Sequence, residues 1–162
     1  MSGRIFFFSD PHFGHRNMAI KRGFETVEEH DEHIVEKWNS VVTKRDTVYL
    51  LGDITMEKAN YSILSRLNGF IKGVLGNHDK PQHVLELLKY INSVCGMIKV
   101  KGFILTHCPI HDSEVDRFIG NIHGHVHENS INDKRYFNVS AENINYTPIS
   151  LEDIIKLRNE EK

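Results

Sequence analysis

One arrangement recurs along this chain of 162 residues: an apolar run, a tight turn that often carries glycine, and then a side chain able to bind a metal. It follows the runs 4–9, 46–51 and 70–75, and it appears again at His107 and at His123–His127. Continuous apolar runs of this length are typical of strands buried on both faces inside an α/β fold. Open α/β sheets bind ligands beyond the carboxyl ends of their strands, so we expect these polar side chains to share one site.

Helical patterns alternate with the expected strands. Thr26 and Glu29 resemble a capping box and predict a helix over 26–40, while Pro81 begins a second helix that extends to about Tyr90. That second helix should turn its apolar side chains inward: Val84, Leu85, Leu88 and Ile91. Further expectations are an apolar face over 59–67, strands over 97–100, 103–106 and 136–140, a hairpin turn at 101–102, and a closing helix capped by Ser150 with Asp153. With no repeat or linker, we expect one domain spanning residues 1–162.

Composition narrows the classes of partner. A formal charge of −2 gives no large basic field for a long nucleic acid, and no apolar segment approaches the length of a membrane span. We therefore expect no long nucleic-acid partner, no membrane association and a cytoplasmic location. The chain has 11 histidines and only two cysteines, which favours a metal site built from nitrogen and oxygen ligands. Of the cysteines, Cys108 is expected to be a small buried apolar residue.

The candidate functional residues all belong to the recurring pattern. They are Asp10, His12, Asp53, Asn77, His78, Asp79, His107, His125 and His127. Carboxylate, imidazole and amide oxygen are ligands of hard and borderline divalent metals, so seven of these residues could complete two coordination shells if one carboxylate bridges. The other two are then left for proton transfer. Three histidines in predicted helices are expected to be solvated or cap-adjacent side chains: His30, His33 and His83.

Five ordered blocks carry a resemblance to a known family. DPH at 10–12, GD at 52–53, GNHD at 76–79, His107 and GHVH at 124–127 resemble the motifs of the calcineurin-like metallophosphoesterases. The resemblance implies an α/β fold in which a two-sheet β-sandwich is flanked by helices, in four αββα layers.

The resemblance also implies a role for each residue of the blocks. Asp10, His12 and His127 would hold one divalent metal ion, and Asn77, His107 and His125 the other, with Asp53 as the bridge. His78 would contact the phosphate as an acid, and Asp79 would tune or orient its imidazole. Manganese is the metal that the resemblance favours, while iron, zinc, nickel and cobalt suit the same ligands.

The function implied is hydrolysis of phosphate esters by in-line attack of a metal-bridging hydroxide, with a small or nucleotide-type phosphodiester as substrate. Only 27 residues separate Asp79 from His107 and 17 separate His107 from His125, which leaves little room for a cap domain. His15 and Asn17, in a predicted loop after the first block, are expected to contact the substrate. Two alternatives stay open: a phosphomonoesterase acting on nucleotides or phosphoproteins, and a non-catalytic scaffold of the same fold. The oligomeric state is open as well.

Overall fold

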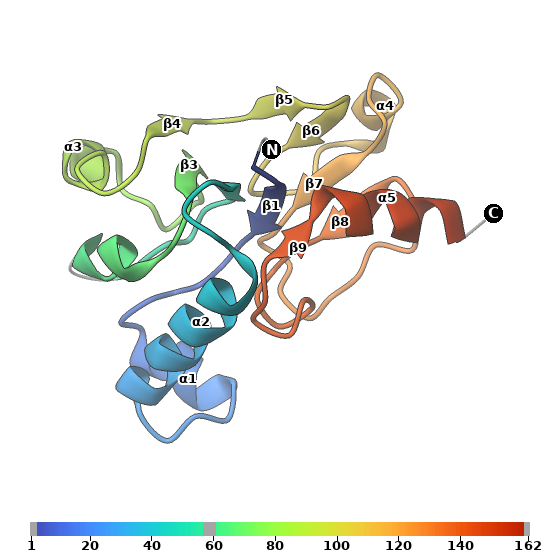
Figure 1. The fold of residues 1–162 in the computed structure, drawn as a ribbon. Helices are drawn as coiled ribbons and strands as arrows, with labels where there is room; N and C mark the ends of the chain where they lie inside the picture. The colour runs from blue at the N-terminus through green and yellow to red at the C-terminus, as the bar shows by residue number, and fades with distance from the viewer. Residues whose placement is uncertain (1–2, 57–60, 161–162) are drawn as a thin grey trace.

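The structure is a computed structural model that describes residues 3–56 and 61–160, and it contains two sheets flanked by helices (Figure 1). The first sheet has the strand order β4-β3-β2-β1-β9, in which only β9 is antiparallel to its neighbour. Its strands are β1 (Ile5–Phe8), β2 (Thr47–Leu50), β3 (Phe70–Val74), β4 (Ser93–Cys95) and β9 (Ile149–Ser150). The two-sheet α/β architecture expected from the sequence is confirmed.

The second sheet has the order β5-β6-β7-β8, with β5 antiparallel to β6 and the other pairs parallel. Its strands are β5 (Ile98–Val100), β6 (Phe103–Leu105), β7 (Asn121–His123) and β8 (Tyr136–Asn138). Lys101 and Gly102 join β5 to β6 with φ angles of 49° and 90°, and two successive positive φ values are what a primed hairpin turn needs. The predicted hairpin is confirmed.

Strand β1 has three consecutive phenylalanines, and their side chains are buried on both faces of the sheet. Phe6 and Phe8 belong to the core between the first sheet and its helices, where the Phe8 ring lies 5.5 Å from the ring of Trp38. Phe7 points the other way and packs in the core between the two sheets, to which Leu105 also belongs. Alternation along the strand therefore lets one short run support two cores.

The helix expected over 26–40 is present as α2 (Val27–Val41), and Thr26 caps it by accepting a hydrogen bond from the Glu29 backbone N–H at 3.1 Å. A shorter helix, α1 (Arg16–Lys21), lies beside it (Figure 1). The closing helix is α5 (Leu151–Glu160), where Ser150 Oγ accepts from the Asp153 N–H at 3.1 Å, as predicted.

The prediction for the segment after Pro81 was wrong in its detail. A 3₁₀ turn, η2 (Pro81–His83), runs into a single helical turn, α3 (Val84–Leu87). Leu85 is 81% exposed and Leu88 is 41% exposed, whereas Leu87 and Ile91 are buried. The chain leaves the helix after one turn so that Ile91 can lie over Gly73, where a Cβ would come within 2.8 Å of its Cδ1.

The remaining short elements are η1 (Tyr61–Arg66) and α4 (Asp112–Val115). The apolar face expected over 59–67 lies partly outside the described residues; within them, Tyr61 and Leu64 are buried in the first core. No helix among the described residues is long and apolar enough to cross a membrane.

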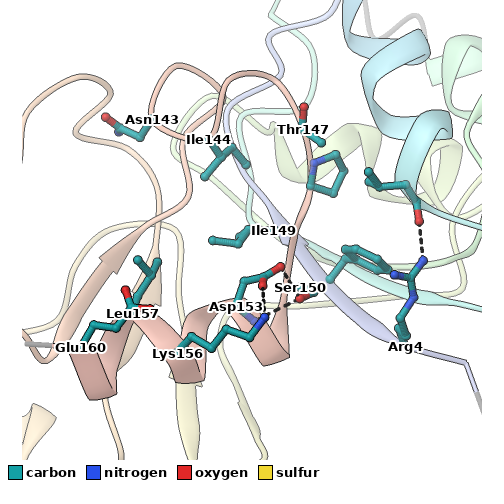
Figure 2. A pocket seen from close by; sticks show the side chains of 13 residues that line it. Arg4, Asn143, Ile144, Thr147, Ile149, Ser150, Asp153, Lys156, Leu157 and Glu160 are labelled. Carbon is teal, nitrogen blue, oxygen red and sulfur yellow. Dashed lines mark hydrogen bonds and ion pairs between the residues drawn. The ribbon is translucent and has the colours of Figure 1, made fainter.

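A cavity of about 530 Å³ opens beside β9 and α5 (Figure 2). Arg4, Ile149 and Lys156 are among the residues that line it. Among the residues that the structure describes, its lining contains none of the candidates for metal binding or catalysis. The chemistry predicted from the sequence must therefore be sought at the carboxyl ends of the strands.

Candidate metal centre

The candidate ligands follow the carboxyl ends of five strands from both sheets. Asp10 and His12 follow β1, Asp53 follows β2, Asn77 follows β3, His107 follows β6, and His125 and His127 follow β7. Backbone hydrogen bonds tie the first two loops together, because Asp10 N–H donates to Gly52 O and His12 N–H donates to Asp53 O, both at 3.1 Å. The structure therefore brings together residues that lie up to 117 positions apart, from Asp10 to His127.

Asp10, His12 and His127 form a cluster that we call the buried half-site. Their ligand atoms all lie within 4.8 Å of one another. His12 Nε2 is 3.8 Å from Asp10 Oδ1, and His127 Nε2 is 4.0 Å from the same oxygen. Burial lowers the pKa of His12 to about 3, so its imidazole is neutral and offers a lone pair.

Several buried polar atoms of this half-site lack a hydrogen-bond partner within the described part of the chain, and this shows whether the half-site fits a metal ion. Asp10 is fully buried and His12 is 3% exposed, yet Asp10 Oδ1 and both ring nitrogens of His12 have no hydrogen-bond partner among the described residues. Buried polar atoms without a partner are costly and rare. A divalent cation would satisfy the carboxylate oxygen and one imidazole nitrogen together, so these residues fit a metal.

Asn77, His107 and His125 form the open half-site, in which Asn77 and His125 are exposed. His107 Nδ1 donates to Leu51 O at 2.7 Å, so in the neutral ring Nε2 carries the lone pair. That nitrogen lies 2.9 Å from Asn77 Oδ1, which is also an acceptor. Two acceptors that face each other suit a shared cation.

In the metal-free protein a proton can take the place of that cation on His107. Burial alone would lower the pKa of His107, but its hydrogen bond to Asp53 and the charges of Asp53 and Asp10 raise the pKa above its ordinary value.

Asp53 lies between the two half-sites. Its Oδ1 is 3.4 Å from His107 Nε2, and its Oδ2 is 3.8 Å from His12 Nε2, so one oxygen faces each half. Burial alone would raise the pKa of Asp53, but the hydrogen bond and charge of His107 and the His78 N–H hold the pKa below its ordinary value. The carboxylate is therefore ionised, as a bridging ligand must be.

The backbone at these ligands adopts an unusual conformation. Left-handed φ angles occur at Asp10 (57°), His12 (50°), Asp53 (50°), His125 (70°) and His127 (50°). Such angles cost about 1–3 kcal/mol for a side chain with a Cβ and persist where the surrounding structure enforces them, often at functional sites. The folded chain therefore holds these five ligands in place against a local preference for other angles.

Two motif glycines explain how the loops approach so closely. A Cβ added at Gly76 would lie 2.2 Å from Asp53 Oδ1, and one at Gly124 would lie 2.2 Å from Asp10 Oδ2. Each glycine thus leaves room for the carboxylate that follows a neighbouring strand.

His78 and Asp79 occupy different environments. The His78 side chain is 45% exposed, and its Nε2 lies 3.9 Å from Asp53 Oδ2, at the open side of the centre. Asp79 is buried, and its carboxylate accepts from the N–H groups of Asp53, Ile54 and Gly76 at 2.8, 3.0 and 2.8 Å. Among the described residues, the hydrogen bonds to this carboxylate come from backbone amides and not from the His78 ring, so Asp79 braces the turns after β2 and β3. The expectation that Asp79 orients the His78 ring by a hydrogen bond is therefore corrected.

The two expected substrate contacts lie at the start of α1, where the sequence had suggested a loop. His15 is the N-cap residue, and its ring lies 5.9 Å from the ring of His12. Asn17 is exposed on the helix itself. His15 is therefore the one that borders the centre.

Sequence reasoning missed Arg22 and Glu142, which support the buried half-site. The Arg22 side chain is 1% exposed and donates to the carbonyls of Asp10 and Pro11 at 2.7 and 3.0 Å. It also donates to Glu142 Oε1 at 2.9 Å, and the same oxygen accepts from His127 Nδ1 at 3.1 Å. Arg22 thereby holds the Asp10 loop and, through Glu142, orients the ring of His127.

The contact between Glu142 and His127 shifts both groups toward their charged forms. Burial alone would raise the pKa of Glu142, but the bond from His127 and the charge of Arg22 lower the pKa to about 2. The same bond raises the pKa of His127.

His30 extends this network and is fully buried, so the expectation of a solvated ring was wrong. Its Nε2 lies 2.8 Å from Arg22 Nη1, and its Nδ1 lies 2.8 Å from Asp31 Oδ1. A guanidinium only donates, so Nε2 accepts and Nδ1 carries the proton toward Asp31. No short motif links these residues, and only the folded structure reveals the network.

Comparisons with known proteins place this geometry in a family. No family model matches the chain. The uncharacterized protein MJ1445 of Methanocaldococcus jannaschii is 35% identical over an alignment that covers 95% of this chain and 90% of that protein. A protein of unknown function from Aquifex aeolicus, AQ665, has a similar structure with a TM-score of 0.76 and 28% identity, covering 96% of this chain and 100% of that one.

A structure described as a novel archaeal phosphodiesterase shares the fold, with a TM-score of 0.53 and 24% identity over 83% of this chain and 82% of that one. The chain belongs to the same family as MJ1445, and it shares its fold with this phosphodiesterase. The chain and MJ1445 are relatives along nearly their whole lengths. The fold that the five sequence blocks implied is confirmed, and their resemblance to the calcineurin-like metallophosphoesterases stays a prediction.

Proposed function

We propose that this protein is a metallophosphoesterase that hydrolyses small or nucleotide-type phosphodiesters, by in-line attack of water at a centre of two divalent metal ions. One observation carries the proposal: the buried Asp53 carboxylate turns one oxygen toward His107 and the other toward His12. A carboxylate so placed suits a ligand shared by two cations. Manganese is our first choice for both positions, on the family resemblance.

Two bound cations would lower the pKa of a water molecule and neutralise negative charge on the phosphate. The protein contributes the arrangement around them. Asp10 and Asp53 are buried carboxylates that balance the positive charge, and Asp79 fixes the backbone of the Asp53 turn. His78, exposed beside Asp53, is placed to donate a proton to the departing oxygen or to contact the phosphate.

The exposed side of the centre favours a small or flexible substrate. Asn77, His78 and His125 are exposed there, and the loops that link the motif residues are short. The charge of −2 again argues against a long nucleic acid. A phosphomonoester is the alternative substrate class. A non-catalytic scaffold is less favoured because all seven candidate ligands converge while His78, which metal binding does not need, sits at the centre.

His15 is our candidate for substrate contact, because its ring borders His12 at the entrance to the centre. Replacing His15 with Ala should raise KM while the metal content stays unchanged. Unchanged kinetics would remove His15 from the substrate site.

Purified protein assayed with bis-nitrophenyl phosphate and with nitrophenyl phosphate, across added Mn²⁺, Ni²⁺, Zn²⁺ and Mg²⁺, tests the proposal. We expect metal-dependent turnover, faster on the diester, and its loss in His78→Ala and Asp53→Asn. The two variants separate the roles: His78→Ala should retain both metal ions, whereas Asp53→Asn should lose at least one of them. Absence of turnover with every metal would overturn the proposal, and faster turnover of the monoester would select the alternative substrate class.

A further inference from the structure

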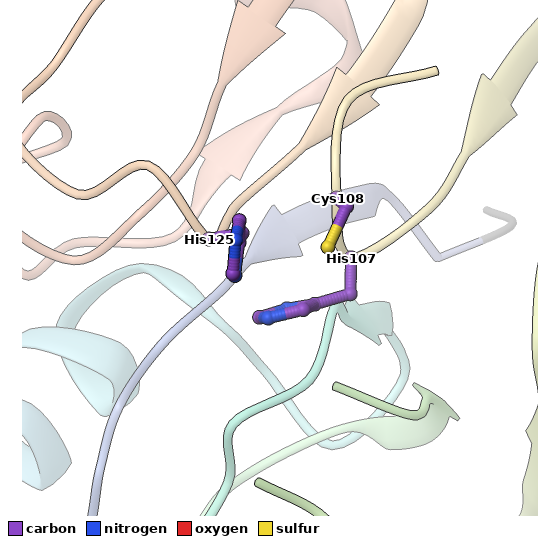
Figure 3. Close-up of side chains that lie close together, drawn as sticks. All are labelled: His107, Cys108 and His125. Carbon is purple, nitrogen blue, oxygen red and sulfur yellow. The ribbon is translucent and has the colours of Figure 1, made fainter. Parts of the chain in front are cut away.

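Cys108 lies in the metal centre, although the sequence had suggested a buried apolar residue. It is exposed and directly follows His107 at the end of β6. Its sulfur and one ring nitrogen each of His107 and His125 all lie within 4.8 Å of one another. Figure 3 shows the three side chains, with the sulfur turned toward the space between the two rings.

The backbone that carries this thiol is fixed by buried hydrogen bonds. Thr106 Oγ1 donates to Cys108 O at 2.6 Å, and the buried Asn121 donates from Nδ2 to Thr106 Oγ1 at 2.9 Å. Asn121 Oδ1 in turn accepts from Ile110 N–H at 3.0 Å. Both ends of the turn around Cys108 are therefore tied to one buried side chain of β7.

An observation that does not involve the thiol indicates a cation at this place. His107 Nδ1 donates to Leu51 O, so in the neutral ring Nε2 is an acceptor, and it lies 2.9 Å from Asn77 Oδ1, a second acceptor. Asp10, Asp53 and His107 also offer ligand atoms within 4.8 Å of one another, so His107 belongs to two overlapping sets. A positive ion next to His107 Nε2 and Asn77 Oδ1 would satisfy both acceptors and would lie near the thiol.

We propose that Cys108 is a thiolate ligand of the metal in the open half-site, beside His107 and His125. The inference rests on the metal centre of the proposed function and adds to its ligand set. On binding, the thiol releases its proton to solvent as the metal–sulfur bond forms. Thiolate binds softer ions more strongly, so Cys108 should raise the affinity of the open half-site for zinc or cadmium more than its affinity for manganese.

Cadmium and cobalt alone are suitable probes, because a thiolate bound to either ion gives a charge-transfer absorption that imidazole and carboxylate ligands do not. We expect this band in the wild-type protein and in Cys95→Ser, whose sulfur lies on β4 and donates to Gly73 O at 3.6 Å. The band should vanish in Cys108→Ser, and Cd²⁺ affinity should fall at least about tenfold while Mn²⁺ affinity changes less. Circular dichroism would establish that both variants are folded.

The outcomes separate the two proposals. Metal that binds to the wild-type protein without a charge-transfer band would overturn the role of Cys108 and leave the metal centre standing. A band that persists in Cys108→Ser would also overturn it. Failure of the wild-type protein to bind any divalent metal would overturn the metal centre together with the thiolate ligand.

Discussion

The two half-sites differ in how the protein prepares them. In the buried half-site, Asp10 and His12 are enclosed, and His127 is oriented by Glu142, which Arg22 holds in turn. In the open half-site, Asn77 and His125 are exposed. Rigid ligands with supporting hydrogen bonds bind metal more tightly than ligands that must be ordered by the ion. We therefore expect the buried half-site to fill first and the open half-site to exchange its metal more readily.

The largest effect on activity should come from Gly124→Ala, because this change displaces ligands in both the buried and the open half-site. The new Cβ would lie 1.9 Å from Ser9 Oγ and 2.2 Å from Asp10 Oδ2, so Asp10 must move. The same oxygen accepts from His125 N–H at 2.9 Å, so the open half-site shifts as well. A displacement of about 1 Å costs catalysis on the order of 100-fold, so diester hydrolysis should fall at least that far.

Gly96→Ala is the matched control for this change. Apart from its neighbours in the chain, no atom of the described residues lies within 4 Å of the position of its added Cβ, so its activity should equal that of the wild-type protein. Equal activity of the two alanine variants would contradict the close approach of the Gly124 loop to Asp10.

Arg22→Met should act mainly on stability. The change leaves the carbonyls of Asp10 and Pro11 and the charge of Glu142 without their donor. Removing one partner of a buried ion pair costs about 3–5 kcal/mol in the free energy of unfolding, which urea denaturation of the metal-free protein would measure.

Arg66→Met provides the comparison, since Arg66 pairs with Glu32 at the surface. An exposed pair contributes about 0–1 kcal/mol, so this variant should unfold nearly as the wild-type protein does. Similar losses in the two variants would mean that the buried network is not what stabilises the Asp10 loop.

The smallest effect, but the most selective, is expected from Glu142→Gln. His127 loses a charged acceptor for its Nδ1 proton, and such losses typically cost 10- to 100-fold in metal affinity, that is about 1.4–2.7 kcal/mol. Isothermal titration with Mn²⁺ should show the tighter step weakened and the second step little changed. Glu128→Gln, at an exposed residue that pairs with Lys21, should alter neither step. Equal weakening of both steps would argue against two differently supported half-sites.

The most accurate predictions from the sequence concerned the repeated motifs and the interactions between residues close together in the chain. Five blocks at strand ends sufficed for the fold and for the convergence of seven candidate ligands, and the cap at Thr26 located α2. Hydrophobic pattern failed after Pro81, because packing over Gly73 ended the helix and left Leu85 exposed.

The supporting residues of the centre could not be predicted for a different reason. Arg22, His30 and Glu142 meet through the fold, at separations that no motif records. The prediction that Cys108 is buried was wrong, because a hydrophobic strand pattern does not predict the turn after β6 that places its sulfur near two histidines. Asp79 was assigned to its sequence neighbour His78, whereas its hydrogen bonds go to backbone amides of two turns.

The central claim is that Asp53 is shared by two metal ions. Native mass spectrometry tests it by counting the manganese ions bound to the wild-type protein and to Asp53→Asn. If Asp53 is shared by two ions, the wild-type chain should carry two Mn²⁺ and the variant at most one, held by the buried half-site. A single ion in the wild-type chain, or two ions retained by Asp53→Asn, would contradict a bridged pair of metals.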